Sequence, residues 1–479
     1  MRGRAAFPGR AGAPRGGGAF GVSVSAAGAS DIVADTVVTR GAGAVGIFAS
    51  NYTSQYGSSG DAGSSASISI HTGAVSTTGY GADAIHAIDS APGSISIQGQ
   101  VAATQGDLAN AVFAAAADGP VVVDMAHVNT AGRGSGGVYA IAANGDASVR
   151  ADTVSTAGNG ANGIYAFSGG GTANVTVGDV KTTGYYGSNG ITAVSGAGDV
   201  SVTAGHVATT GFGSYGIAAQ ALNHVGVSAG SVDVAGPFSS GIIAVAGSAD
   251  ITVDGAIGTH QYASNGVFAI TYGGDLTIAT KGTITSEGMR NTGISAQSRG
   301  GNIAITSNEI HMTPASAGFG VGIKARAIGG DITINAGTVT TTGDNSTGIY
   351  AVSYAKDDTD HRAGTIAVTA GAVSTTGNGR TASGIAAFNH MQGGTTAVAV
   401  TGALTTQGTY AEGVYAFSES GKALVTIASA STAGADAAAV DARGASVVIK
   451  ATGAVQTTGE QSSGLRGQAS AGGVTIDNL

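Results

Sequence analysis

The chain has 479 residues with 84 Gly, 6 Pro, no Cys and no Trp, and 10% of its residues are charged. The lack of Cys excludes disulfide bridges and Cys-ligated zinc, and the abundance of Gly excludes long helices. The net charge is −9, although Arg2, Arg4, Arg10 and Arg15 are all close to the N-terminus. The rest of the chain is therefore more acidic, which argues against a nucleic-acid partner.

The first part of the chain, residues 1–29, is rich in Arg, Gly, Pro and Ala. It carries the positive charge of a signal peptide but lacks the apolar central region. We predict a disordered arm or a truncated start over residues 1–29. A repeat array is predicted over residues 30–479.

A phrase of the form G-I-x-A recurs along the repeat array, and its first residue, Gly or Ala, serves as a marker. Most intervals between successive markers are close to 26 residues, which is typical of repeat architectures. The markers are residues 46, 84, 111, 137, 163, 190, 216, 241, 266, 293, 322, 348, 384, 413, 439 and 464.

Each repeat carries three short apolar alternations. In one repeat they are the phrase at 163–168, the pair Val175/Val177, and the V-x-T segment Val180-Lys181-Thr182. Alternation with period two between Gly, Asn, Asp and Ser residues is typical of β-strands. The pattern predicts an all-β parallel β-helix of about sixteen coils, each with about 26 residues and three short strands. A strand spacing of about 4.8 Å makes this a rod roughly 75 Å long.

Equivalent positions of the coils share residue types. The position after the marker is always Ile, Val or Leu, and the position two residues further is Ala in every coil except at Gly467. Both positions have the same parity and are predicted to point inward. Thr recurs in the V-x-T segment with inward parity, which predicts a stacked ladder of hydroxyl groups. Asn-Gly pairs such as 162–163 predict positive φ at the turn before the phrase.

Two intervals between markers are longer than the others. Their extra residues lie between Ser50 and Ala66 and between Tyr354 and Ala363, so both enlarge the turn that follows the first strand. Insertions on one turn often mark the binding side of a solenoid. Acidic residues at 357, 358 and 360 offer oxygen ligands to a cation, but we favour a solvated charged loop.

Enzymes with a β-helix fold need clustered carboxylates, with Lys or Arg, on the outer face of one strand stack. The charged outward positions here are Lys324 with Arg326, and Asp441 with Arg443 and Arg466. One Asp among basic groups is not an acid–base pair. The His residues show no metal-ligand spacing. We therefore predict no catalytic site, metal site or cofactor. The alternative is a carbohydrate-active β-helix enzyme, either a polysaccharide lyase or a hydrolase.

The position two residues after the marker points outward and is often aromatic. Contiguous exposed apolar area often marks an interaction site. Stacked rings that only stabilise the coil, partly covered by turn residues, are the simpler interpretation. The candidate partner-binding residues are Tyr139, Tyr165, Phe268, Tyr350 and Tyr415.

The segments VTTTGDNSTGIYAVS (339–353), VSTAGNGANGIYAFS (154–168) and VKTTGYYGSNGITAVS (180–195) resemble passenger regions of bacterial autotransporters. Filamentous-haemagglutinin-like adhesins share such repeats. The resemblance covers residues 30–479 and implies a right-handed β-helix, export through the periplasm, and exposure at the outer membrane or outside the cell. It also implies a C-terminal translocating β-barrel, which this sequence lacks, so we expect the β-helix to be incomplete at its C-terminal end.

The expected function is that of a non-catalytic structural or adhesive rod of a Gram-negative bacterium, surface-exposed or secreted. Its loops and outward aromatic stripe are expected to bind the partner. The expected partners are a host or cell-surface protein or glycan, other rods by self-association, and the downstream translocator barrel. No nucleic-acid partner is expected.

Overall fold

The computed structural model describes residues 3–11, 18–52, 66–313, 318–357, 363–379 and 382–479. Within these ranges every regular element is a β-strand. The strands form two parallel sheets, A and B, stacked as a β-solenoid of about 16 turns with about 27 residues per turn. The predicted parallel β-solenoid is therefore confirmed. The chain divides into two compact units, Met1–Gly230 and Ser231–Leu479.

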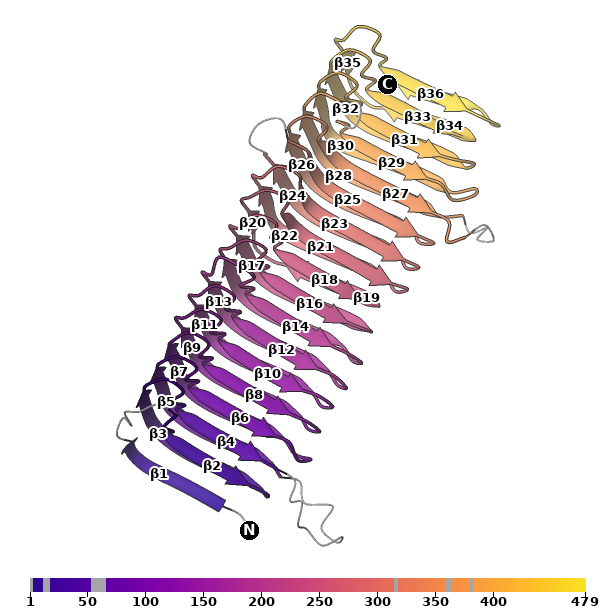
Figure 1. The fold of residues 1–479 in the computed structure, drawn as a ribbon. Coiled ribbons are helices and arrows are strands. Elements are labelled where there is room, and N and C mark those ends of the chain that lie inside the picture. Colours follow the sequence, from indigo (N-terminus) through magenta and orange to yellow (C-terminus); the bar gives the residue numbers. More distant parts are fainter. Residues whose placement is uncertain (1–2, 12–17, 53–65, 314–317, 358–362, 380–381) are drawn as a thin grey trace. The chain divides into compact units, whose positions relative to one another are not determined.

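In unit 1, each short strand of sheet B starts directly after a marker or at the equivalent position. Figure 1 shows these strands side by side with their arrows pointing the same way. They are β2 (Val22–Ala26), β4 (Ile47–Asn51), β6 (Ile85–Asp89), β8 (Val112–Ala116), β10 (Val138–Ala142), β12 (Ile164–Ser168), β14 (Ile191–Ser195) and β16 (Ile217–Ala221).

The strands of sheet A in unit 1 are about twice as long. They are β1 (Gly3–Ala11), β3 (Ser30–Arg40), β5 (Ile68–Thr78), β7 (Ile95–Gln105), β9 (Val121–Thr130), β11 (Ala147–Thr156), β13 (Ala173–Thr182) and β15 (Val200–Thr209), while β17 (His224–Val234) crosses the boundary between the units.

Unit 2 repeats the same plan. Its sheet B contains β18 (Ile242–Ala246), β21 (Asn265–Tyr272), β23 (Asn291–Arg299), β25 (Gly320–Ile328), β27 (Thr347–Tyr354), β29 (Ile385–Asn389), β31 (Val414–Ser418), β33 (Val440–Gly444) and β36 (Leu465–Ala469). Its sheet A contains β19 (Ser248–Val253), β20 (Ile257–Thr259), β22 (Leu276–Ser286), β24 (Ile303–Met312), β26 (Ile332–Thr342), β28 (Thr365–Thr376), β30 (Thr395–Gln407), β32 (Lys422–Ala433), β34 (Ser446–Ala451), β35 (Val455–Thr457) and β37 (Val474–Asn478).

The core lies between the two sheets and follows the predicted inward columns. Ile164 and Ala166 of β12 are fully buried and pair in register with Ile191 and Ala193 of β14. A stack of Ala at one level leaves no room for branched side chains, because protein interiors are packed at crystal density. The prediction that both columns point inward is confirmed.

The second and third predicted segments are joined in most turns. In β13, the buried residues are Ala173, Val175 and Val177, and then Val180 and Thr182. The buried parity changes at 178–179, where the strand bends around a corner while its pairing with β15 continues. The two segments are separate strands only in β19/β20 and β34/β35 among the described turns. A turn therefore has one short strand and one long bent strand more often than three short ones.

The array of strands starts earlier than residue 30. Strand β2 pairs in parallel with β4, and β1 pairs with β3. The boundary predicted at residue 30 therefore falls inside the first turn. In this turn the segment Gly21-Val22-Ser23-Val24 carries Val where the phrase has Ala, so it does not match the phrase. Both long insertions follow strands of sheet B, β4 and β27, as predicted. Residues 53–65 and 358–362 of the insertions lie outside the described residues.

Thr259 donates to Oγ of Ser286 in the next turn, but most hydroxyls of the Thr column in the described residues do not bond along the stack. Thr130 donates instead to the carbonyl oxygen of Ser135, five residues later, at 2.7 Å, and Thr406 donates to the carbonyl oxygen of Ala411 at 2.8 Å. Each such hydroxyl closes the corner that leads from sheet A to sheet B in its own turn. A buried carbonyl group is thereby satisfied where no strand partner is available.

The backbone at this corner has positive φ at the third residue before the marker, not at the predicted Asn-Gly pairs. Gly134 and Gly160 have φ of 65° and 70°, while Leu108, Ala263 and Arg290 have φ of 54°, 53° and 60°. Gly is required at the marker for a different reason. A Cβ on Gly137 would lie 2.4 Å from the carbonyl oxygen of Gly163 in the next turn. Close approach of successive turns therefore selects Gly at the marker.

In unit 2, substitution of Thr by Val is predicted to affect the free energy of unfolding differently at two positions of the Thr column. We expect Thr406→Val to lower the free energy of unfolding by about 1–2 kcal/mol, because the carbonyl of Ala411 loses its donor in a buried corner. Thr341 is fully buried and its hydroxyl has no hydrogen-bond partner, so Thr341→Val is expected to be neutral or stabilising. Urea unfolding of both variants measures the difference. Equal losses for the two variants would contradict the corner role.

Candidate binding surface on sheet B

The five candidate residues all point outward from sheet B, and all are half-buried. Tyr139 and Tyr165 lie in adjacent turns of unit 1, with ring centroids 5.5 Å apart. Burial raises the pKa of the Tyr139 hydroxyl, and a hydrogen bond with Asn162 opposes that shift. The two rings are in contact and are tilted by 35° to one another.

Another series of ring contacts in unit 1 includes Phe20 and His86, which do not belong to the predicted aromatic stripe. Phe20, Phe48, His86 and Phe113 follow one another with centroid separations of 5.2, 5.6 and 4.8 Å. The imidazole Nδ1 of His86 lies 2.7 Å from a carboxylate oxygen of Asp83, which orients the ring. His fills a gap in the column because its flat ring stacks like the phenyl rings on either side.

Phe268 is not brought together with the other candidates. Its register neighbours on β18 and β23 are Ile243 and Ser295. The side chain is half-buried and stands alone among aliphatic and polar neighbours. Of the five candidates, it has the least support as part of a binding surface.

In unit 2, Tyr350 and Tyr415 form one cluster with Phe388. The centroid of the Phe388 ring lies 5.7 Å from Tyr350 and 5.2 Å from Tyr415. Phe388 comes from the second outward position of β29, four residues after its marker. In the same turn, the first outward position is Ala386, which pairs in register with both tyrosines. The two tyrosines are therefore separated by one turn that carries no ring in their column.

Cations flank this cluster. The guanidinium of Arg443 lies 5.5 Å from the ring centroid of Tyr415, and that of Arg326 lies 5.3 Å from the ring of Tyr354. Tyr354 also stacks on His390 at 5.0 Å, and His390 contacts Phe417 at 5.5 Å. In such cation–π contacts the ring face attracts the guanidinium electrostatically.

Asp441 occupies the outward position that follows Tyr415. Its side chain has no exposed area, accepts a hydrogen bond from Nη2 of Arg443 at 2.8 Å, and is also bonded by Arg466. Burial alone would raise the pKa of Asp441, but the hydrogen bonds from Arg443 and Arg466 outweigh burial and lower that pKa. The carboxylate is therefore a charged anchor for the two arginines.

Glu412 lines the same region and, like Phe388, was not among the residues predicted from the sequence. It lies one residue before the marker Gly413, outside the outward columns, and its side chain is 21% exposed. Burial, followed by the negative charge of Asp441, raises the pKa of Glu412 to about 7. Nη2 of Arg466 lies 3.9 Å from its Oε1. The signal in the sequence is a single Glu one residue before a marker, next to turns that carry Arg443 and Arg466.

These residues surround a pocket of about 210 Å³ in unit 2. Thr347, Ser383 and Glu412, each one residue before its marker, form a polar wall. Tyr350 and Tyr415 bound the pocket along the stack, Ala386 lies between them, and Phe388 lines it from the second outward position. We call this pocket the Ala386 slot.

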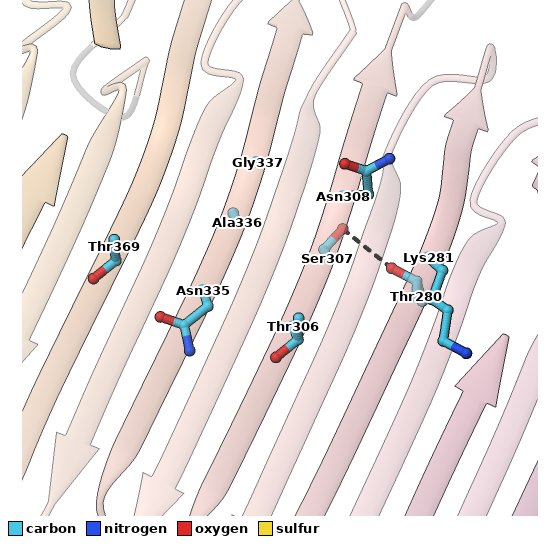
Figure 2. Close-up of a pocket in the computed structure, with 9 residues that line it drawn as sticks. All are labelled: Thr280, Lys281, Thr306, Ser307, Asn308, Asn335, Ala336, Gly337 and Thr369. Carbon is cyan, nitrogen blue, oxygen red and sulfur yellow. Dashed lines mark hydrogen bonds between the residues drawn. The ribbon is translucent and has the colours of Figure 1, made fainter. Parts of the chain in front are cut away.

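A larger hollow of about 490 Å³ lies along sheet A of unit 2. Figure 2 shows its residues on neighbouring parallel strands, with exposed polar side chains such as Thr306, Asn335 and Thr369 along its surface. Thr280 and Ser307 share a hydrogen bond of 3.1 Å, and Lys281 pairs with Asp254 at 2.7 Å. The hollow follows the bend of the long strands and offers polar groups without an aromatic wall.

The described residues contain no group of three or more His, Asp or Glu side chains placed to hold a metal ion. Most of the acidic insertion considered for a cation, residues 358–361, lies outside the described residues. In the described part of the chain, no helix is long and apolar enough to cross a membrane.

Comparison with family models, with curated proteins and with solved structures finds no match to this chain. The resemblance to autotransporter passenger regions therefore rests on the repeated phrases alone.

The raised pKa of Glu412 predicts a loss of stability as pH increases. In the unfolded chain the carboxyl ionises near pH 4.5, whereas in the folded state it keeps its proton up to about pH 7. The folded state thus binds more protons between these values, and the free energy of unfolding falls across this window, by on the order of 2–3 kcal/mol. We expect Glu412→Gln to remove this component of the pH dependence. Urea midpoints measured from pH 4 to pH 8 test it, and identical profiles for both proteins would contradict it.

Proposed function

We propose that this chain is a non-catalytic structural or adhesive β-solenoid that binds its partner through sheet B. The observation that carries the proposal is the Ala386 slot, with its aromatic and charged neighbours on one face of unit 2. Apolar rings with a few convergent polar groups are the usual composition of a recognition site. The partner proposed is a host or cell-surface protein or glycan.

The charge distribution supports this class of partner over nucleic acid. The chain is acidic, with a net charge of −9. Of the arginines near the slot, Arg443 and Arg466 are both bonded to Asp441. A phosphate backbone requires free basic groups to displace its counterions, and these arginines already neutralise a carboxylate.

A carbohydrate-active enzyme is the second candidate, favoured by one observation. Glu412 and Asp441 are carboxyl groups whose pKa values are shifted in opposite directions, which is the pattern of an acid and its ionised partner. However, the side chain of Asp441 is fully covered and bonded to two arginines. A glycosidase needs both carboxyl groups to reach the substrate or its attacking water. Glu412 is thus left without an accessible partner, and we favour binding over catalysis.

Location and assembly follow from the resemblance to autotransporter passenger regions. We propose that the chain is exported through the periplasm and exposed at the outer membrane or released outside the cell. A downstream translocator β-barrel and self-association between solenoids belong to the same proposal. Its support is the recurrence of the phrase quoted above in both units of the chain.

The aromatic residues of sheet B predict a loss of adhesion. Replacing Tyr139, Tyr165 and Tyr350 together by Ser is expected to reduce binding of the purified protein to cultured epithelial cells by at least about tenfold, since each ring contributes apolar contact area. The control replaces Tyr80, Tyr185 and Tyr272, which are 61%, 59% and 52% exposed and lie outside the stripe. Circular dichroism should be unchanged for both triple variants. Equal adhesion of the two would make the stripe purely structural.

The same preparations separate binding from catalysis. We expect no release of reducing or unsaturated ends from neutral or acidic polysaccharides beyond that of Glu412→Gln. Product formation by the wild-type protein that Glu412→Gln abolishes would favour the enzyme instead.

A further inference from the structure

The outward cations of β23 and β25 form a basic patch on sheet B of unit 2, which consists of Arg299, Lys324 and Arg326. All three side chains are exposed, and Figure 1 shows the two strands side by side between β21 and β27. The strands β21, β23, β25, β27 and β29 contain no Asp or Glu. Since the full chain has 29 acidic and 20 basic residues, the charge of this face is opposite to that of the chain.

The cations of the basic patch keep their charge and their donors available. Among the described residues, no ion pair or side-chain hydrogen bond reaches any of the three. The guanidinium of Arg299 lies 5.2 Å from the ring centroid of Tyr272, and that of Arg326 lies 5.3 Å from the ring of Tyr354. A ring face attracts a guanidinium without neutralising it. Both arginines can therefore still donate hydrogen bonds to a ligand.

Carboxylates occur at the edges of the basic patch, in the turns before and after the strands. Glu287 lies 3.3 Å from a ring nitrogen of His260. Three others each accept a backbone N–H from the next turn, namely Asp275 from Asn302, Asp331 from Thr365, and Asp344 from Asn378. Asp357, in the insertion after β27, is exposed, and residues 358–362 lie outside the described part of the chain. The strands between these edges present positive charge only.

The spacing of the three cations follows from the strand geometry. Lys324 and Arg326 are alternate residues of β25, about 6.7 Å apart along the strand. Arg299 pairs in register with Ile328, two residues beyond Arg326, so it lies about 8 Å from Arg326 on a diagonal. The patch therefore suits a linear anion with widely spaced charges. Phosphates of a nucleic-acid strand recur about every 3.4 Å, whereas a polysaccharide carries its carboxylates no closer than one to a sugar ring.

The neighbours of the cations favour a sugar over an acidic peptide. Ser295 and Gln297 are half-buried register partners of Lys324 and Arg326, and they add neutral hydrogen-bonding groups beside each cation. Tyr350 follows Lys324 in register on β27 and offers a ring to the C–H groups of a sugar. Both strands are paired on each side, so an added peptide strand finds no free backbone groups.

We propose that the basic patch binds an acidic polysaccharide that carries carboxylate groups on its sugar rings. This inference rests on the adhesive function proposed above and names the chemical class of the partner. Arg299 and Arg326 each match a carboxylate with the planar fork of a guanidinium, and Lys324 acts as a point charge. Exposed ion pairs are individually weak, so affinity arises when one polysaccharide chain engages several of them at once.

The test removes the charge of the basic patch and compares this with an equal loss of charge elsewhere. The patch variant combines Arg299→Gln, Lys324→Gln and Arg326→Gln. The matched control combines Arg133→Gln, Arg150→Gln and Lys181→Gln, which are exposed positions of unit 1 outside sheet B. The probes are polymannuronate, neutral dextran, polyglutamate and an oligothymidylate. Calorimetry on the full chain is done in about 0.1 M salt, where charges more than about 10 Å away are screened.

We expect polymannuronate to bind the wild-type protein with a dissociation constant of about 100 μM, and dextran not to bind. The patch variant should weaken this binding by at least about tenfold, whereas the control variant should change it less than about twofold. Arg326→Glu reverses one charge and is expected to weaken binding more than Arg326→Gln does. Raising the salt to about 0.5 M should also weaken binding, because salt screens exposed charges. Circular dichroism and urea midpoints check the fold of each variant.

Three results would overturn the proposal: no binding of polymannuronate, equal weakening by the patch and control variants, or tighter binding of polyglutamate or oligothymidylate than of polymannuronate. The outcome is separable from that of the adhesive function. If polymannuronate fails to bind while the wild-type protein and the patch variant adhere equally to cells, the patch assignment is wrong and adhesion stands. If polymannuronate binds through the patch but the protein does not adhere to cells, the adhesive function fails.

Discussion

The close approach of successive turns at the marker column is the constraint on which this structure depends. A Cβ on Gly348 would lie 2.4 Å from the carbonyl oxygen of Gly384 in the next turn and 2.9 Å from Cγ1 of Val373 in the core. Contacts this short require a residue without a side chain in most turns. Because the turns stack at the strand spacing, the same requirement returns at each turn, and neighbouring positions become columns with one role each. The Ala column is the next consequence, since the backbones are too close for larger residues.

The parts of the fold that depend on these columns were predictable from the sequence. Ile349 and Ala351 point inward as their period-two pattern requires, and the two insertions enlarge the same turn. The corners were not predictable in the same way. Thr130 bonds to its own turn because the chain path brings the Ser135 carbonyl within reach, and the periodicity contains no information about that path. The positive φ at the corner was also not predictable. Leu108 and Arg290 adopt this left-handed conformation although it is disfavoured for residues with such side chains.

The residues of the candidate site also differ in whether the sequence predicted them. Tyr350 and Tyr415 were found because they belong to a repeated outward column. Phe388 and Glu412 were not, since each stands at a position that is aromatic or acidic in few turns. Their proximity becomes apparent only when the turns are stacked in register, because residues far apart in sequence then become neighbours. Column statistics identify what most turns share, and by construction they overlook a site built from exceptions.

Irregular positions are therefore more informative about function than repeated ones. A residue repeated in most turns meets a packing requirement that most turns impose, so its recurrence says little about a ligand. Ala386 interrupts an aromatic column, and Asp441 replaces an aromatic residue with a buried charge that needs two arginines to neutralise it. Burial of Glu412 beside Asp441 opposes folding at neutral pH. The pocket lined by Glu412, Phe388 and the two tyrosines is already open in this structure, and such preorganisation lowers the entropic cost of binding.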